Sequence, residues 1–185
     1  MDAAVFLDRD NTLIANDGDL GDPKLVRLVE GVGAGLGALR DAGYRLVVVT
    51  NQGGVARGSF SESDVDAVHQ RLAALLDQAA GCSNLIDRFY YCPYHPEGPV
   101  ERYRRDHPWR KPHPGMLLKA AQDLGLDLAR SWMVGDGDRD MAAGRAAGCR
   151  TVLVSRNGEA PGPTPATVVA PTFADAAQAI LRANR

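Results

Sequence analysis

Short apolar runs alternate with amphipathic stretches along the whole of this 185-residue chain. The apolar runs predict strands, at residues 3–7, 45–50, 86–91, 132–134, 151–154 and 167–169. The amphipathic stretches between them predict helices, at residues 32–42, 62–80, 114–124, 139–147 and 173–183. Strands that alternate with helices indicate a parallel sheet with helices on both faces. We therefore expect an α/β fold of three layers.

Residues at the predicted helix ends support these boundaries. Ser61 and Asp64 have the spacing of an N-cap with an acidic partner. Gly43, Gly125 and Gly148 each follow a predicted helix, where glycine is the usual residue. These local signals and the apolar pattern agree on the same elements.

Alternate glycines at residues 31–37 resemble a dinucleotide-binding turn. No strand precedes them, however, and Ala38 occupies the position of the third glycine of that motif. We therefore expect these glycines to be small residues in a helix that packs closely on the sheet.

Length and composition predict a single domain over residues 1–185. A chain of this length in which 45% of the residues are hydrophobic can fill one core. The Pro/Gly-rich residues 158–165 predict a surface loop rather than a linker between domains. We expect this domain to be a monomer.

Charge and targeting signals exclude several classes of partner. A formal net charge of −2 gives no reason to expect binding to nucleic acid or to an anionic membrane. The chain shows neither a signal-like N-terminal segment nor a run of about 20 apolar residues, so we expect a cytoplasmic protein. Three widely spaced cysteines predict reduced thiols.

Two carboxylates, Asp8 and Asp10, follow the first predicted strand. In an open parallel sheet, ligands bind beyond the carboxyl ends of the strands. Neighbouring carboxylates repel each other unless a cation or proton lies between them, and Mg²⁺ takes one or two carboxylates together with phosphate oxygens. The pair therefore favours Mg²⁺-assisted phosphoryl chemistry. Taken alone, it could also be an Asp-rich turn that closes a strand.

The second predicted strand ends in Thr50, Asn51 and Gln52, followed by Gly53 and Gly54. A hydroxyl, two amides and glycines whose N–H groups can approach an anion form a plausible phosphate cradle. An ordinary Asn/Gly turn is the alternative.

Adjacent cations, Arg110 and Lys111, precede the helix predicted from residue 114, in a segment stiffened by prolines. Lysine suits a transferring phosphoryl group as a point charge, and arginine offers a fork for a second anion or for sugar hydroxyls. A solvated basic pair is the alternative.

The fourth predicted strand is followed by Asp136, Asp138 and Asp140. A Ca²⁺ loop is excluded, because Met141 and Ala147 occupy the positions that need Gly and Glu. The preferred interpretation is that Asp136 is a third metal carboxylate and that the following helix orients Asp140. The last two acids could also simply complement the helix dipole.

Together, these four clusters resemble the signatures of the haloacid dehalogenase (HAD) phosphatase superfamily, over residues 4–154. Residues 6–10, 47–58, 90–96 and 110–116 are similar to the D-glycero-D-manno-heptose-1,7-bisphosphate 7-phosphatases, whose near relatives are the histidinol-phosphate phosphatases. The resemblance implies a Rossmann-like three-layer sandwich with a mainly parallel sheet. It also implies a minimal cap, formed by the loop after the first strand.

The chemistry and the resemblance predict the same catalytic roles. Asp8 would attack phosphorus and form an aspartyl-phosphate. Asp10 would act as general acid and then as general base. Mg²⁺ would be bound by Asp8, the backbone carbonyl of Asp10, and Asp136. Thr50 and Lys111 would hold the transferring oxygens.

The substrate, a small sugar phosphate, would meet a second set of residues. We expect the substrate-binding positions to be Asn51, Gln52, Gly53, Arg57 and Arg110. The leading hypothesis is a heptose bisphosphate. Histidinol phosphate is the alternative, since Asp17, Asp19 and Asp22 could suit its amine, and a non-catalytic phosphosugar-binding protein is the second alternative.

The chain departs from the heptose family at three places. Residues 16–23 lack its Tyr-Val pair, and Gly137 replaces a basic residue after the fourth-cluster acid. The loop that carries structural zinc in the family is degenerate. Cys92 is kept, but Tyr94 replaces a histidine, and His107 and Trp109 replace two cysteines.

We therefore expect zinc to be absent, with aromatic and proline packing in its place. The alternative is a site made of Cys92, His95, His107 and His113, which would need four correctly aimed donors.

Overall fold

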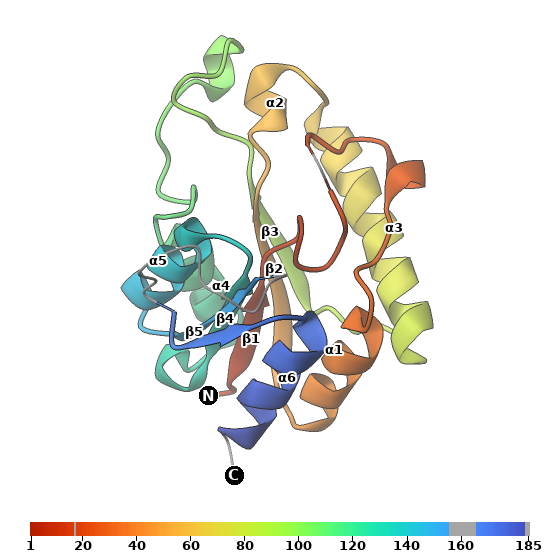
Figure 1. The fold of residues 1–185 in the computed structure, drawn as a ribbon. Coiled ribbons are helices and arrows are strands. Elements are labelled where there is room, and N and C mark those ends of the chain that lie inside the picture. Colours follow the sequence, from red (N-terminus) through yellow and green to blue (C-terminus); the bar gives the residue numbers. More distant parts are fainter. Residues whose placement is uncertain (17, 156–165, 184–185) are drawn as a thin grey trace.

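The computed structural model describes residues 1–16, 18–155 and 166–183, and it contains one six-stranded parallel sheet (Figure 1). The strand order is β3-β2-β1-β4-β5-β6. The strands are β1 (Ala4–Leu7), β2 (Arg45–Asn51), β3 (Arg88–Cys92), β4 (Trp132–Gly135), β5 (Arg150–Val154) and β6 (Val168–Ala170). The predicted α/β fold with a parallel sheet is confirmed. The loop predicted at residues 158–165 lies outside the described residues.

Helices lie between the strands from β1 to β5, and a further helix follows β6, as the sequence predicted. They are α1 (Val32–Asp41), α2 (Gly54–Arg57), α3 (Glu62–Ala80), α4 (Gly115–Leu124), α5 (Asp138–Ala146) and α6 (Phe173–Arg182). Three short 3-10 turns, Pro23–Leu25, Glu101–Tyr103 and Leu128–Arg130, lie in the loops. In the part of the chain that the structure describes, no helix is long and apolar enough to cross a membrane.

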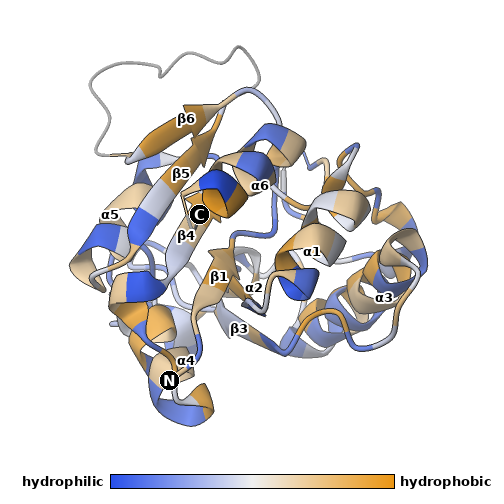
Figure 2. Ribbon diagram, turned by 90° about the horizontal axis from the view of Figure 1, so that it is seen from below, coloured by the Kyte–Doolittle hydropathy of each residue, from blue (hydrophilic) through white to orange (hydrophobic). Residues whose placement is uncertain are grey.

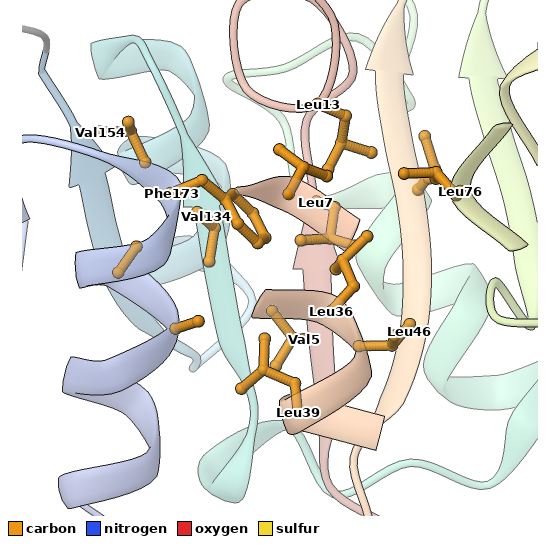
Figure 3. Close-up of a cluster of buried hydrophobic side chains, with 14 of the residues drawn as sticks. Val5, Leu7, Leu13, Leu36, Leu39, Leu46, Leu76, Val134, Val154 and Phe173 are labelled. Atoms are coloured by element: carbon orange, nitrogen blue, oxygen red, sulfur yellow. The ribbon is translucent and has the colours of Figure 1, made fainter. Parts of the chain in front are cut away.

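The helices form a layer on each face of the sheet. One buried cluster joins the strands to α1, α3 and α6, and the other joins them to α4 and α5. The view along the sheet in Figure 2 shows these two groups on opposite sides of the strands. In Figure 3, Phe173 of α6 and Leu36 of α1 point into the same space as Leu7 and Val134 of the central strands. The three-layer sandwich follows from strands that are apolar on both faces.

The predicted helix ends are confirmed. Ser61 and Asp64 form a capping box at the start of α3. Gly43, Gly125 and Gly148 all have positive φ angles, of 88°, 63° and 88°, which glycine adopts without strain.

The glycines of α1 pack against helices rather than against the sheet. A Cβ at Gly33 would lie 2.5 Å from Cβ of Ala79 in α3, and one at Gly35 would lie 3.0 Å from the ring of Phe173 in α6. The predicted helix is confirmed, and it packs on the sheet through Leu36 and Leu39 while its glycines contact the neighbouring helices. Small residues let α1 lie between two neighbouring helices.

Most boundaries differ from the sequence prediction by a single residue, and two features differ more. Strand β3 begins at Arg88 rather than residue 86, because the Asp87 carboxylate accepts a hydrogen bond from Leu46 N at 2.8 Å and pairs with Arg40 and Arg45. The single-turn helix α2 was not predicted. It is too short to show helical periodicity, and it ends at Gly58 in the left-handed region.

Strand β1 is central in the sheet and lies between β2 and β4. Leu7 is in register with Val48 of β2 and with Val134 of β4, so the residues after these strands meet at one edge. The long segment after β3 and the short helix α2 rise above this edge in Figure 1. The sheet thus brings the four sequence clusters to one place.

Candidate active site

Lys111 is the centre of the site. Its Nζ lies 2.6 Å from Oδ1 of Asp8 and 2.6 Å from Oδ1 of Asp140, and it donates to the carbonyl of Val49 at 2.8 Å. The lysine is 2% exposed and both acids are buried. One side chain therefore connects the ends of β1 and β2 with the first turn of α5.

Burial and charge perturb each member of this group. Burial raises the pKa of Asp8 to about 7, and the charges of Asp140 and Asp10 add to the rise while Lys111 opposes it. Burial alone would lower the pKa of Lys111, but the two carboxylates outweigh it and raise that pKa. Lys111 is therefore charged at neutral pH, and the acids repel one another.

A third carboxylate completes an acidic cluster. Oxygens of Asp8, Asp136 and Asp140 lie within 4.8 Å of one another. Burial, followed by the charge of Asp8, raises the pKa of Asp136 to about 6. Three carboxylates and one ammonium leave an excess of two negative charges, which matches a divalent cation with oxygen ligands. The donor set therefore fits Mg²⁺.

The fit between Asp140 and the end of β4 depends on Gly135. A Cβ at Gly135 would lie 2.4 Å from the Asp140 carboxylate, so only glycine permits this approach. The Asp140 Oδ2 also accepts a hydrogen bond from Gly137 N at 3.2 Å. Asp140 thus caps α5 and holds Lys111 at the same time.

Asp10 is held by three side chains. Its Oδ1 accepts hydrogen bonds from Arg9 Nη2 at 3.1 Å and from Asn16 Nδ2 at 2.7 Å. Its Oδ2 accepts one from Gln52 Nε2 at 2.9 Å. Arg9, which is fully buried, also donates to Gln52 Oε1 at 2.9 Å. This network fixes the carboxylate beside the acidic cluster.

The amide residues after β2 bond other residues of the site. Both polar atoms of the Asn51 side chain contact the backbone of Lys111, each at 2.9 Å. Gln52 is 3% exposed, and its Nε2 also donates to Thr50 Oγ1 at 2.9 Å. The contacts predicted for Asn51 and Gln52 with substrate stay predictions. In this structure the two amides position Lys111, Thr50 and Asp10.

A cavity of about 390 Å³ opens over the acidic cluster. Its lining also includes Arg57, His95, Arg110 and Arg139, which we call the basic group. A Cβ on Gly53 would lie 3.1 Å from Arg57 Nη1, 3.3 Å from His95 Cδ2 and 3.6 Å from Arg110 Nη1, so these side chains converge. The cavity therefore places Lys111 and a candidate metal site beside one phosphate and offers further cations to another anion.

Comparisons with known proteins agree with this geometry. A family model described as HAD-hydrolase-like matches residues 108–176. A D-glycero-β-D-manno-heptose-1,7-bisphosphate 7-phosphatase from Haemophilus ducreyi is 43% identical over 157 residues, which are 85% of this chain and 85% of that protein. The chain belongs to the HAD-like phosphatase family.

Solved structures support the same assignment for this phosphatase. A protein described as a HAD-like phosphatase from Mesorhizobium loti has a TM-score of 0.85 at 37% identity, covering 98% of this chain and 85% of that one. A D,D-heptose 1,7-bisphosphate phosphatase from B. bronchiseptica, complexed with magnesium and phosphate, has a TM-score of 0.80 at 29% identity, covering 98% and 99%. The family resemblance and the enzyme class predicted from the sequence are confirmed.

Sequence reasoning missed three contributors to the phosphatase site and gave a fourth another role. Arg9 and Asn16 hold Asp10, and Arg139 lines the cavity. Asp19, named from the sequence as a residue that could suit an amine, pairs with Arg57. Arg9 carried a signal, since an arginine between two acids at a buried strand end needs a carboxylate partner. The others lie in loops or at a helix start, where sequence periodicity does not indicate side-chain direction.

Contacts between aromatic side chains hold the degenerate zinc-binding loop in place. Tyr94 stacks on His107 with a centroid separation of 4.4 Å, and Arg105 lies 4.1 Å above the Tyr94 ring. Trp109 lies edge-on to His107 at 6.1 Å. Cys92 is buried, and His95 lines the catalytic cavity instead.

Among the described residues, Asp8, Asp136 and Asp140 form the one group of three or more His, Cys, Asp or Glu side chains with converging ligand atoms. The alternative site of Cys92, His95, His107 and His113 is therefore not assembled.

We predict that the purified phosphatase contains no stoichiometric zinc. The reason is that ring stacking, rather than four converging donors, holds the loop. Elemental analysis of protein purified without chelators or a histidine tag measures this directly, and Cys92→Ser should melt within a few degrees of wild type. Near-stoichiometric zinc, lost together with thermal stability in Cys92→Ser, would contradict the prediction.

Asn51→Ala should lower kcat by about 10- to 100-fold with a smaller change in KM. The substitution removes two hydrogen bonds that place the Lys111 backbone, so the ammonium is aimed less well at the reacting group. Steady-state kinetics of the purified variant provide the measurement. An increase in KM with kcat unchanged would instead indicate that Asn51 contacts the substrate directly.

Proposed function

We propose that this chain is a Mg²⁺-dependent phosphatase that removes the 7-phosphate of D-glycero-D-manno-heptose 1,7-bisphosphate through an aspartyl-phosphate on Asp8. The observation that carries the proposal is the position of Lys111 Nζ, 2.6 Å from both Asp8 and Asp140. A nucleophilic carboxylate next to a fixed ammonium is suited to attack on a phosphate whose oxygens need a cation. The name of the H. ducreyi relative suggests the substrate.

Asp8 would attack phosphorus through Oδ2. Lys111 binds Oδ1, and Oδ2 has no hydrogen bond to the described part of the chain, which leaves it available for attack. Lys111 and the Thr50 hydroxyl would hold the transferring oxygens. Thr50 Oγ1 accepts from Gln52, so its own proton is free to be donated to phosphate.

Asp8, Asp136 and the backbone carbonyl of Asp10 would hold the metal ion. When bound, Mg²⁺ would polarise the phosphoryl group and offset its charge against the attacking carboxylate. Asp140 has a different task, because its two oxygens are engaged by Lys111 and by Gly137 N. It keeps the ammonium in place beside the nucleophile.

Asp10 would protonate the leaving sugar oxygen and then deprotonate the water that hydrolyses the aspartyl-phosphate. Its Oδ1 already accepts hydrogen bonds from Arg9 and Asn16, whereas Oδ2 accepts one from Gln52. The transferred proton would therefore reside on Oδ2, which keeps a free lone pair. Arg9, Asn16 and Gln52 would act by fixing that geometry.

Charge favours a bisphosphate over histidinol phosphate. Of the three acids that could suit an amine, Asp19 pairs with Arg57 and Asp22 caps the turn at Pro23–Leu25. Asp17 lies outside the described residues. The far end of a substrate would meet the basic group instead, which repels a cationic amine and attracts a second phosphate.

A panel of phosphate esters tests the proposal. With Mg²⁺ at neutral pH, kcat/KM for the heptose bisphosphate should exceed that for histidinol phosphate by at least about 100-fold. Phosphate release is the measurement, and Asp8→Asn protein prepared in parallel controls for contaminating phosphatases. Equal rates, or a preference for histidinol phosphate, would overturn the substrate assignment.

We also propose that the phosphatase acts as a cytoplasmic, single-domain monomer on a free small molecule, without a nucleic-acid or membrane partner. The net charge of −2 and the single sheet support this view.

A further inference from the structure

Arg139 is a cation for which the described part of the chain supplies no ion-pair partner. It is the second residue of α5, it is exposed, and it lines the same cavity as Asp8 and Lys111. Within the described residues it forms no ion pair, whereas Arg57 in the same cavity is paired with Asp19. The free charge of Arg139 therefore faces a cavity built for an anionic ligand.

The position of Arg139 does not serve the stability of the free protein. The first turn of a helix carries a partial positive charge, so a cation there is unfavourable. The neighbouring cations add repulsion. Burial, and then the positive charges that include Arg139 and Arg57, lower the pKa of Arg110. Burial, and then Arg110, Arg57 and Arg139, also lower the pKa of His95. An anion bound among them would relieve this repulsion.

The basic group is separate from the cation that serves the reacting phosphate. Asp8, Asp140 and the Val49 carbonyl hold the Lys111 ammonium at the reacting end of the cavity. Arg110 donates from Nη1 to the Tyr94 carbonyl at 3.3 Å and forms no ion pair among the described residues. Gly137, two residues before Arg139, also lines the cavity but has no side chain that could bind a ligand. Of the arginines that line the cavity, Arg139 and Arg110 are thus the ones left without an ion pair to another described residue, and both are available to a second anion.

We propose that Arg139 binds the phosphate at the far end of the sugar, together with Arg110, and so sets the preference for a bisphosphate over a monophosphate. This inference rests on the proposed function. It assigns Arg139 a binding task and no part in bond cleavage. The ligand chemistry is a phosphate monoester dianion, which a guanidinium binds through two parallel N–H groups.

The test compares heptose 1,7-bisphosphate with heptose 7-phosphate, which lacks the distal phosphate. Arg139→Ala should raise KM for the bisphosphate by about 10- to 100-fold and change kcat less. KM for the monophosphate should change by less than about twofold, and Arg139→Lys should recover part of the loss. Arg71→Ala, the same change at an exposed position on α3 outside the cavity lining, is the matched control and should behave as wild type.

The outcomes separate the inference from the proposed function. If wild type does not turn over the bisphosphate, the proposed function fails. The distal site is then tested separately, with p-nitrophenyl phosphate as substrate and heptose 1-phosphate as inhibitor. The inhibition constant of heptose 1-phosphate should be higher for Arg139→Ala than for wild type, and an unchanged constant would refute the role of Arg139. Suppose that wild type prefers the bisphosphate, but that Arg139→Ala raises KM equally for both substrates or for neither. The role of Arg139 is then refuted while the proposed function stands.

Discussion

Asp8→Asn should abolish turnover and leave the fold unchanged. The amide can still accept a hydrogen bond from Lys111, but its nitrogen cannot form an acyl phosphate. We expect kcat to fall by about 10⁴-fold or more. Steady-state kinetics measure the loss, and circular dichroism with thermal melting checks the fold. Asp10→Asn should be milder, at about 10²- to 10⁴-fold, since it removes proton transfer but keeps the nucleophile and the backbone carbonyl of residue 10.

The control for this prediction is Asp138→Asn. This exposed acid lies in the same first turn of α5 as Asp140 but is not part of the cavity lining, so wild-type kinetics are expected. Retention of even a tenth of the wild-type kcat by Asp8→Asn would show that the covalent mechanism is wrong.

Lys111→Ala should damage both catalysis and stability. It removes the charge that would stabilise the transferring group, and we expect kcat to fall by about 10²- to 10³-fold. It also leaves Asp8 and Asp140 buried without their cation, which should lower the free energy of unfolding by about 3–5 kcal/mol. Denaturant unfolding and steady-state kinetics on the same preparation measure the two effects.

Arg110→Ala is the companion variant. The arginine lines the cavity but holds no buried acid, so its loss should mainly raise KM and leave the stability close to wild type. Identical kinetic defects in the two variants would disprove this division of labour between adjacent residues.

The sequence predicted those site residues that close a strand or directly follow one. Asp8, Thr50 and Asp136 follow or close buried apolar runs, and parallel strands bring such residues to one edge. The strand order itself could not be predicted, because the alternation of elements is the same for several orders. The family resemblance implied a Rossmann-like parallel sheet, which is confirmed, but the order of the strands comes from the structure alone.

Side-chain partners in the loops could not be predicted. Lys111 contacts Asp140, and the Asn51 side chain bonds the Lys111 backbone. Both contacts depend on the path of a long segment that has no hydrophobic periodicity. The pairing of Asp19 with Arg57 also joins residues that no local pattern connects. Only the three-dimensional path of the chain shows that these residues meet.

The central position of β1 has a consequence for synthesis of the protein. One edge of β1 pairs with β4, and Ala4 N donates a hydrogen bond to Ser131 Oγ, 127 residues later. At about 5–20 residues per second, β1 leaves the ribosome roughly 6 to 25 s before this partner exists. All four residues of β1 are fully buried in the finished protein, so during that interval an apolar strand is incomplete on one edge. Until residues 132–135 are made, the nascent chain therefore carries an apolar strand with an open edge, and Asp8 lacks the Val134 carbonyl that accepts its backbone N–H in the finished protein.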